Sequence, residues 1–176
     1  LDTLPGVFRK GYLGLSIGAQ HVTKKLPLES LISLCQNLEY PVMILGGPED
    51  RERAEQLCSS LPEKHMINAC GAYSINQSAS LVRQCRVLIS NDTGLMHIGA
   101  AFKKKIISVW GNTVPRFGMY PYRADPSSVR FEVKDLPCRP CSKIGYQKCP
   151  KKHFKCMLDQ DLEGMAAMAR KLWDSD

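Results

Sequence analysis

The chain alternates apolar segments that fit strands with amphipathic segments that fit helices, and this alternation limits its fold more than any other feature. Continuous apolar runs such as residues 40–47 are typical of strands that are covered on both faces. Segments such as residues 26–38 place apolar side chains at helical spacing. The repeat predicts an α/β fold, Rossmann-like and doubly wound, with a mostly parallel sheet.

The predicted strands and helices follow one another about five times. Strands are expected at residues 12–19, 40–47, 64–70, 86–92, 105–112 and, more weakly, 128–133. Helices are expected at residues 26–38, 48–61, 76–85, 93–103 and 159–176. Ligands of such sheets bind beyond the carboxyl ends of the strands, near the point where the strand order reverses, so the site is sought there.

The segment SNDTGLMH, residues 90–97, places polar side chains where a strand gives way to a helix. Asp92 is expected to be the helix N-cap, which leaves the N–H groups of Thr93, Gly94 and Leu95 open to an anion. Gly94 allows a ligand close to the backbone, and His97 shares the helix face of Thr93. The simpler alternative is a capped helix with a buried histidine.

Two other strand ends carry charged side chains. Lys24 and Lys25 follow residues 12–19 and could neutralise a phosphate, or form a solvated pair. Glu49 follows residues 40–47 and could accept hydrogen bonds from ribose hydroxyls, or only favour the start of its helix.

The chain has no G-x-G-x-x-G after its first strand and no G-x-x-x-x-G-K-[ST], which disfavours dinucleotide oxidoreductases and P-loop NTPases.

Residues 91–115, NDTGLMHIGAAFKKKIISVWGNTVP, resemble the hallmark segment of glycosyltransferase family 9, the bacterial lipopolysaccharide heptosyltransferases. The segments GAQHVTKKLP (18–27) and LGGPEDRERA (45–54) occur in the order that the family shows. The resemblance covers nearly the whole chain but only the carboxyl-terminal half of such an enzyme. It implies an interdomain linker at residues 1–10, a nucleotide-sugar-binding domain of a GT-B fold at 11–176, and an amino-terminal acceptor domain outside this chain.

The resemblance also implies a role for each candidate residue. Lys24 would meet the donor's phosphates, Glu49 would hold its ribose, and Tyr73 would lie against its base. The diphosphate and sugar would contact Asp92, Thr93, Gly94 and His97. No metal ligand and no catalytic residue are expected in this domain, because the general base would belong to the amino-terminal domain.

The implied activity is inverting, metal-independent transfer of heptose, or a related sugar, from a nucleotide-diphosphate sugar such as ADP-heptose to the lipopolysaccharide core. No cofactor is expected, and this chain would bind the donor without turning it over alone. The expected location is cytoplasmic, with peripheral contact at the inner face of the inner membrane, where the lipid-linked acceptor would be met.

The charge is uneven, because residues 101–160 hold 13 Lys and Arg against four Asp and Glu, within a net charge of +7. This excess favours an anionic partner such as a phosphate, a membrane surface or a nucleic acid. A nucleic-acid-binding module is therefore the alternative function; nucleic acid is not among the partners that the leading hypothesis predicts. The bases of a bound nucleic acid would stack on Phe117, Tyr120, Tyr122, Phe131, Tyr146 and Phe154. A non-catalytic nucleotide-binding domain is a third hypothesis.

The eight cysteines fall into two groups. Cys35, Cys58, Cys70 and Cys85 are expected to be core thiols in a reducing compartment. The second group comprises Cys138, Cys141, Cys149 and Cys156, with His153 among them; it could bind zinc, form a disulfide or remain free structural thiols. The chain starts without Met and shows no signal peptide, and we interpret it as a fragment or a processed protein.

Overall fold

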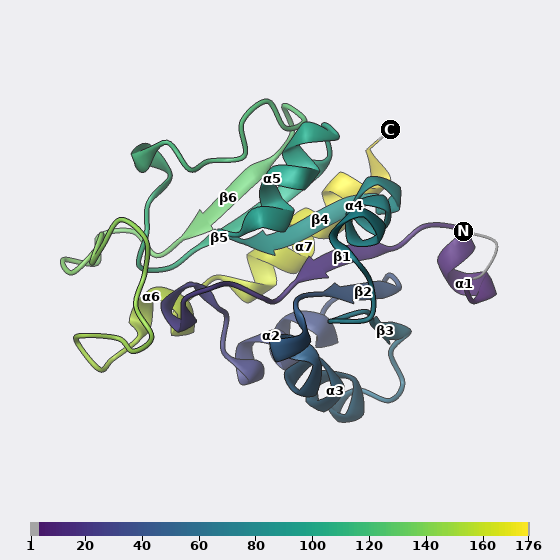
Figure 1. Ribbon diagram of the computed structural model, residues 1–176, viewed down its shortest axis with the longest axis horizontal. Coiled ribbons are helices and arrows are strands. Elements are labelled where there is room, and N and C mark those ends of the chain that lie inside the picture. The colour runs from purple at the N-terminus through teal and green to yellow at the C-terminus, as the bar shows by residue number, and fades with distance from the viewer. Residues whose placement is uncertain (1–3, 176) are drawn as a thin grey trace.

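A six-stranded sheet forms the centre of the computed structural model, which describes residues 4–175 (Figure 1). The strands are β1 (Leu13–Ser16), β2 (Val42–Leu45), β3 (Met66–Asn68), β4 (Val87–Asn91), β5 (Lys105–Trp110) and β6 (Val129–Glu132). Their order is β3-β2-β1-β4-β5-β6, and every neighbouring pair is parallel. The predicted doubly wound α/β fold is therefore confirmed. The order reverses between β1 and β4, which places a crevice beyond their carboxyl ends.

Helices cover both faces of the sheet. One face carries α2 (Leu28–Gln36), α3 (Arg51–Ser60), α6 (Lys155–Leu158) and α7 (Leu162–Asp174), and the other carries α1 (Gly6–Arg9), α4 (Ile75–Gln84) and α5 (Gly94–Ala101). Single 3-10 turns occur at η1 (Val22–Lys24), η2 (Pro48–Asp50) and η3 (Pro115–Phe117). Within residues 4–175, no helix combines the length and the apolar character that crossing a bilayer requires.

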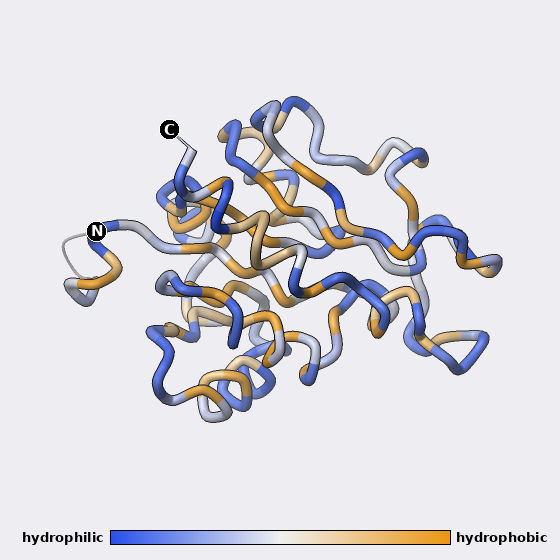
Figure 2. The backbone as a smooth tube through the Cα atoms, turned by 180° about the vertical axis from the view of Figure 1, so that it is seen from behind, coloured by the Kyte–Doolittle hydropathy of each residue, from blue (hydrophilic) through white to orange (hydrophobic). Residues whose placement is uncertain are grey.

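The central strands are mostly apolar because consecutive side chains enter two different cores. In β4, Val87 and Ile89 lie in the core beneath α2 and α7, whereas Leu88 lies in the core beneath α4 and α5. Ile107 and Ile106 of β5 divide in the same way. Figure 2 shows the result, with hydrophobic segments running through the middle of the molecule and hydrophilic ones along its outer loops.

The structure differs from the prediction mainly at the ends of elements. The helix expected at 48–61 begins as the 3-10 turn η2, in which the Asp50 carboxylate accepts the Gly47 N–H at 3.1 Å. The short elements η1, η3 and α6 were not predicted, because a single turn gives too little periodicity to detect. In the segment predicted as a linker, residues 1–3 lie outside the described part, and α1 buries Phe8 against Tyr12. The linker assignment itself stays a prediction.

Three of the four cysteines expected in the core are buried, and Cys58 is half-buried. Burial raises the pKa of the Cys35 thiol to about 12, with a smaller contribution from Cys58. Burial likewise raises the pKa of Cys85 to about 11. The folded chain keeps these thiols protonated. When the same thiols ionise in the unfolded chain, the unfolded state becomes more favourable and the folded state loses stability.

We therefore predict that the free energy of unfolding falls as the pH rises from about 8.5, the ordinary thiol value, towards 11. The unfolded chain loses its thiol protons in this range while the folded chain retains them. Urea denaturation at a series of pH values measures the effect. A Cys35→Ala/Cys85→Ala variant should show a shallower fall, and an equal slope in both proteins would contradict the assignment.

Candidate functional site

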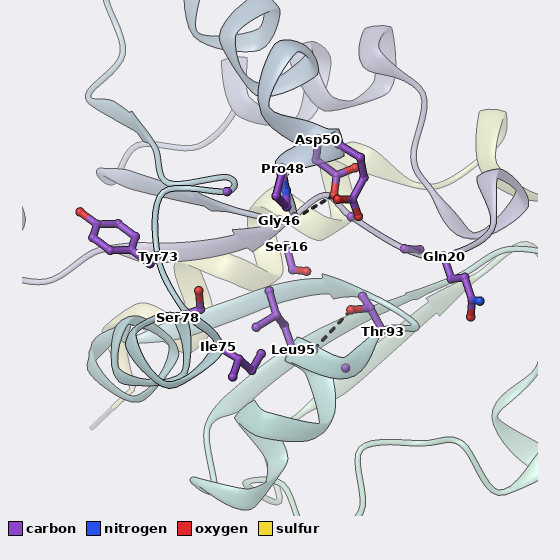
Figure 3. Close-up of a pocket in the computed structure, with 16 residues that line it drawn as sticks. Ser16, Gln20, Gly46, Pro48, Asp50, Tyr73, Ile75, Ser78, Thr93 and Leu95 are labelled. Atoms are coloured by element: carbon purple, nitrogen blue, oxygen red, sulfur yellow. Dashed lines mark hydrogen bonds between the residues drawn. The ribbon is translucent and has the colours of Figure 1, made fainter.

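Two adjacent cavities lie beyond the carboxyl ends of the central strands. The first, which we call the Tyr73 cavity, has a volume of about 480 Å³ and lies between the ends of β1 and β2, α4 and the start of α5 (Figure 3). The second, the Lys24 cavity, has a volume of about 450 Å³ and is also lined by Asp92 and His97. Ala19, Gln20, Thr93 and Gly94 line both cavities. The two spaces thus meet at the N-terminus of α5.

A buried ion pair forms one wall of the Lys24 cavity. Lys24 Nζ lies 2.7 Å from Asp92 Oδ2, and their side chains are only 12% and 4% exposed. The Thr113 hydroxyl, from the loop after β5, donates to the same oxygen at 3.0 Å. The prediction that Asp92 caps α5 is wrong, because both of these groups hold its carboxylate.

The cap of α5 is Thr93 instead. Its Oγ1 accepts the N–H of Leu95 at 3.3 Å, so Leu95 is no longer an open donor. Within residues 4–175, the N–H groups of Thr93 and Gly94 make no hydrogen bond. A Cβ at Gly94 would meet no described atom within 4 Å, so the backbone here is open to the cavities. An anion could therefore reach two free N–H groups at the positive end of the helix dipole.

A second buried ion pair, which the sequence reasoning missed, lies on the other side of β1. Lys25 Nζ contacts Asp50 Oδ1 at 2.7 Å, and Asp50 is 2% exposed. A Cβ at Gly18 would lie 2.3 Å from Asp50 Oδ2, and one at Gly46 would lie 2.9 Å from the same atom. The glycines that end the two strands therefore make room for this carboxylate. The sequence features that could have indicated this ion pair are the glycines Gly18 and Gly46 after the two strands, together with the adjacent Lys24 and Lys25.

The remaining predicted residues lie around the same cavities. Glu49 is exposed within η2, just before α3, and lines the Tyr73 cavity. Tyr73 lies at the margin of that cavity with its ring directed away from the strand ends, while Ile75 and Leu95 add apolar surface (Figure 3). His97 is exposed beside the Lys24 cavity, so the alternative of a buried histidine is wrong. The structure thus gathers all seven predicted site residues around two adjoining spaces.

The second cysteine group lies in the segment that follows β6. All eight cysteines of the chain are free thiols, so the disulfide alternative is wrong. Cys138 Sγ lies 3.7 Å from His153 Nε2. In the part of the chain that the structure describes, no three His, Cys, Asp or Glu side chains are arranged to hold a metal ion. Burial is the main cause that raises the pKa of Cys156, to about 12.

The fold is that of the carboxyl-terminal half of the GT-B glycosyltransferases. The ADP-heptose lipopolysaccharide heptosyltransferase II of E. coli matches with a TM-score of 0.77 and 19% identity, over 98% of this chain and 48% of that one. The E. coli heptosyltransferase WaaC with ADP matches with a TM-score of 0.66 and 19% identity, over 97% and 47%. The iron-containing dodecameric glycosyltransferase TibC matches with a TM-score of 0.62 and 15% identity, over 92% and 44%. At these identities the likeness shows the fold alone.

The sequence matches identify the family. The family model for glycosyltransferase family 9 (heptosyltransferase) matches residues 1–149, and the chain belongs to that family. Lipooligosaccharide heptosyltransferase 2 of Campylobacter jejuni is 28% identical over 177 residues, which cover 96% of this chain and 53% of the relative. The predicted family and enzyme class are confirmed. The chain spans about half the length of this relative.

The Lys24–Asp92 pair yields a stability prediction. Lys24→Met leaves a buried carboxylate without its cation and should lower the free energy of unfolding by about 3–5 kcal/mol. The double variant Lys24→Met/Asp92→Asn removes both charges and leaves an amide oxygen for Thr113, so it should be more stable than Lys24→Met alone. Urea denaturation of Lys24→Met, of Asp92→Asn and of the double variant measures the coupling free energy between the two side chains. A double variant less stable than Lys24→Met would refute the pairing.

Proposed function

We propose that this chain is the donor-binding domain of an inverting, metal-independent heptosyltransferase. It would bind a nucleotide-diphosphate sugar, such as ADP-heptose, for transfer of heptose or a related sugar to the lipopolysaccharide core. One observation carries the proposal: two cavities of ligand size meet at the uncovered N-terminus of α5. A nucleotide-diphosphate sugar likewise has two bulky ends joined by an anionic centre.

The cavities suggest how the donor would lie. Its nucleoside would occupy the Tyr73 cavity, where Ile75 and Leu95 offer apolar surface to a base and Glu49 offers acceptors to ribose hydroxyls. Its diphosphate would lie over Gly94, at the two open N–H groups. Its sugar would enter the Lys24 cavity beside Asp92 and His97. Each volume is within the range of small-molecule sites, about 300–1,000 Å³.

The chemistry follows from the charge that develops. An acceptor hydroxyl attacks the anomeric carbon of the sugar, the bond to the diphosphate breaks, and the electron pair leaves with the diphosphate. Fixed donors at the α5 N-terminus, together with Lys24, would stabilise this growing negative charge in place of a metal ion. Asp92 would keep Lys24 extended towards the leaving group, because the pair is already formed without a ligand.

The proposed architecture assigns the other tasks to an amino-terminal domain that this chain does not contain. Residues 1–10 would be the interdomain linker, residues 11–176 the donor domain, and the general base and most of the acceptor site would lie elsewhere. The isolated chain should therefore bind ADP without transferring sugar. We propose a cytoplasmic location, with peripheral contact at the inner face of the inner membrane. A non-catalytic nucleotide-binding protein would differ by showing no turnover even when both domains are present.

Gly94→Val tests the position of the diphosphate. A Cβ at Gly94 meets no described atom within 4 Å beyond its chain neighbours and its own helix, so the free energy of unfolding should change by less than about 0.5 kcal/mol. The same side chain would occupy the space of the anion, so the Kd for ADP should rise at least about tenfold. Calorimetric titration with ADP measures the affinity, and thermal denaturation checks the fold.

Gly6→Val is the matched control, because a Cβ at Gly6 also meets nothing within 4 Å and α1 lies away from both cavities. It should bind ADP as the unchanged protein does. Equal ADP affinity of the Gly94→Val and Gly6→Val proteins would exclude the diphosphate from the start of α5.

Glu49→Ala tests the contact with the ribose. The unchanged protein should bind ADP at least about tenfold more tightly than 2′,3′-dideoxy-ADP, because a carboxylate that accepts from the hydroxyls contributes about 1.5–3 kcal/mol. The variant should lose this preference and bind the two nucleotides equally. Glu52→Ala removes an exposed acid of α3 that lines neither cavity, and it should keep the preference. A preference that survives Glu49→Ala would move the ribose to another residue.

A further inference from the structure

We infer that residues 142–155, the lysine loop, form a docking surface for an anionic acceptor, a saccharide that bears phosphate or carboxylate groups. This inference deepens the proposed function and rests on it. It adds to the donor domain a part of the acceptor site, which would otherwise belong wholly to the other half of the enzyme.

The first support is the charge of the loop. No Asp or Glu occurs between Asp135 and Asp159. The loop carries five exposed lysines: Lys143, Lys148, Lys151, Lys152 and Lys155. None of them has an acidic partner within 4.0 Å in the part of the chain that the structure describes. Five uncompensated cations on one segment give a surface that attracts anions and repels cations.

The second support is the attachment of the loop to the Lys24 cavity. Thr23 N–H donates to Tyr146 O at 3.1 Å, and Tyr146 N–H donates to Thr23 Oγ1 at 2.8 Å. The Gln147 side chain donates to Gln20 O at 3.1 Å. These bonds join the loop to the segment that carries Lys24. Ile144 is 56% exposed and lines the Lys24 cavity itself.

The third support is the position of the loop, which suits the docking of an acceptor. In Figure 1 the loop projects, in yellow-green, at the end of the sheet opposite to the N and C labels. For transfer, an acceptor hydroxyl must come within about 3–3.5 Å of the anomeric carbon. If the sugar occupies the Lys24 cavity, the acceptor must approach the mouth of that cavity, and Ile144 of the lysine loop lines it. Lysines suit this task because a flexible point charge tolerates different positions of the anionic groups.

The experiment replaces three lysines and measures binding of a soluble probe. Lys148→Gln/Lys151→Gln/Lys152→Gln should raise the Kd for a deacylated, phosphorylated core oligosaccharide of lipopolysaccharide about tenfold at low ionic strength. Added salt should shrink the difference, because exposed charges are screened. Lys→Arg replacements at the same positions should retain binding, since they keep the charge.

The matched control is Lys10→Gln/Arg83→Gln/Lys171→Gln, which removes the same charge from exposed residues outside both cavities. It should bind the oligosaccharide as the unchanged protein does. Equal affinities of the two triple variants would overturn the inference. A loss confined to phosphatidylglycerol vesicles would overturn it as well and assign the loop to the lipid surface.

Titration with ADP separates this inference from the proposed function. Both triple variants should show the same ADP-induced rise in Tm as the unchanged protein. If the unchanged protein shows no such rise, the donor-binding proposal fails. Loop-dependent binding of the oligosaccharide would then still support an anion-docking surface, so the two failures are distinguishable.

Discussion

Two neighbouring lysines hold the carboxyl edge of the sheet together, and the arrangement of the site depends on them. β1 lies between β2 and β4, so consecutive residues after it can reach carboxylates on either side. Lys24 contacts Asp92 after β4, and Lys25 contacts Asp50 after β2. Buried charges are costly unless they are paired, so neither lysine can turn away without leaving a carboxylate uncompensated. The strand ends, and the cavities beside them, are fixed in consequence.

This constraint separates structural charge from charge that a ligand can use. Asp50 is committed to Lys25 and to the Gly47 N–H. Lys24 is held by Asp92 but still lines a cavity, where its remaining N–H groups can reach an anion. The start of α5 supplies the complementary feature, an uncovered backbone at Gly94. In the proposed function, a preformed cation and preformed N–H donors receive the leaving diphosphate with little reorganisation.

Local patterns predicted most of the fold because the two cores require them. Apolar side chains on both faces of β4 make a continuous apolar run, and one-sided burial makes the 3.6-residue period of α2 and α7. The segment at 92–97 was predicted to be a site, and Asp92 was wrongly predicted to cap the helix α5. Lys24 and Thr113 bind the Asp92 carboxylate and so keep it from capping α5. They are distant from Asp92 in sequence and come near it only through the parallel sheet. For the same reason, Asp50 was not singled out from a local pattern.

The sequence by itself determined the α/β class, through the spacing of apolar residues, and the family, through short motifs. The resemblance to that family then supplied the roles of the seven candidate residues. The sequence could not determine which charges meet, since the pairing depends on the strand order and on glycines that admit the Asp50 carboxylate. Only the tertiary structure showed that two cavities share Thr93 and Gly94. It alone brought the lysine loop, more than a hundred residues downstream, against the segment that carries Lys24. These contacts join parts of the chain that are remote in sequence. A local pattern depends only on residues near one another in sequence, so it cannot predict them.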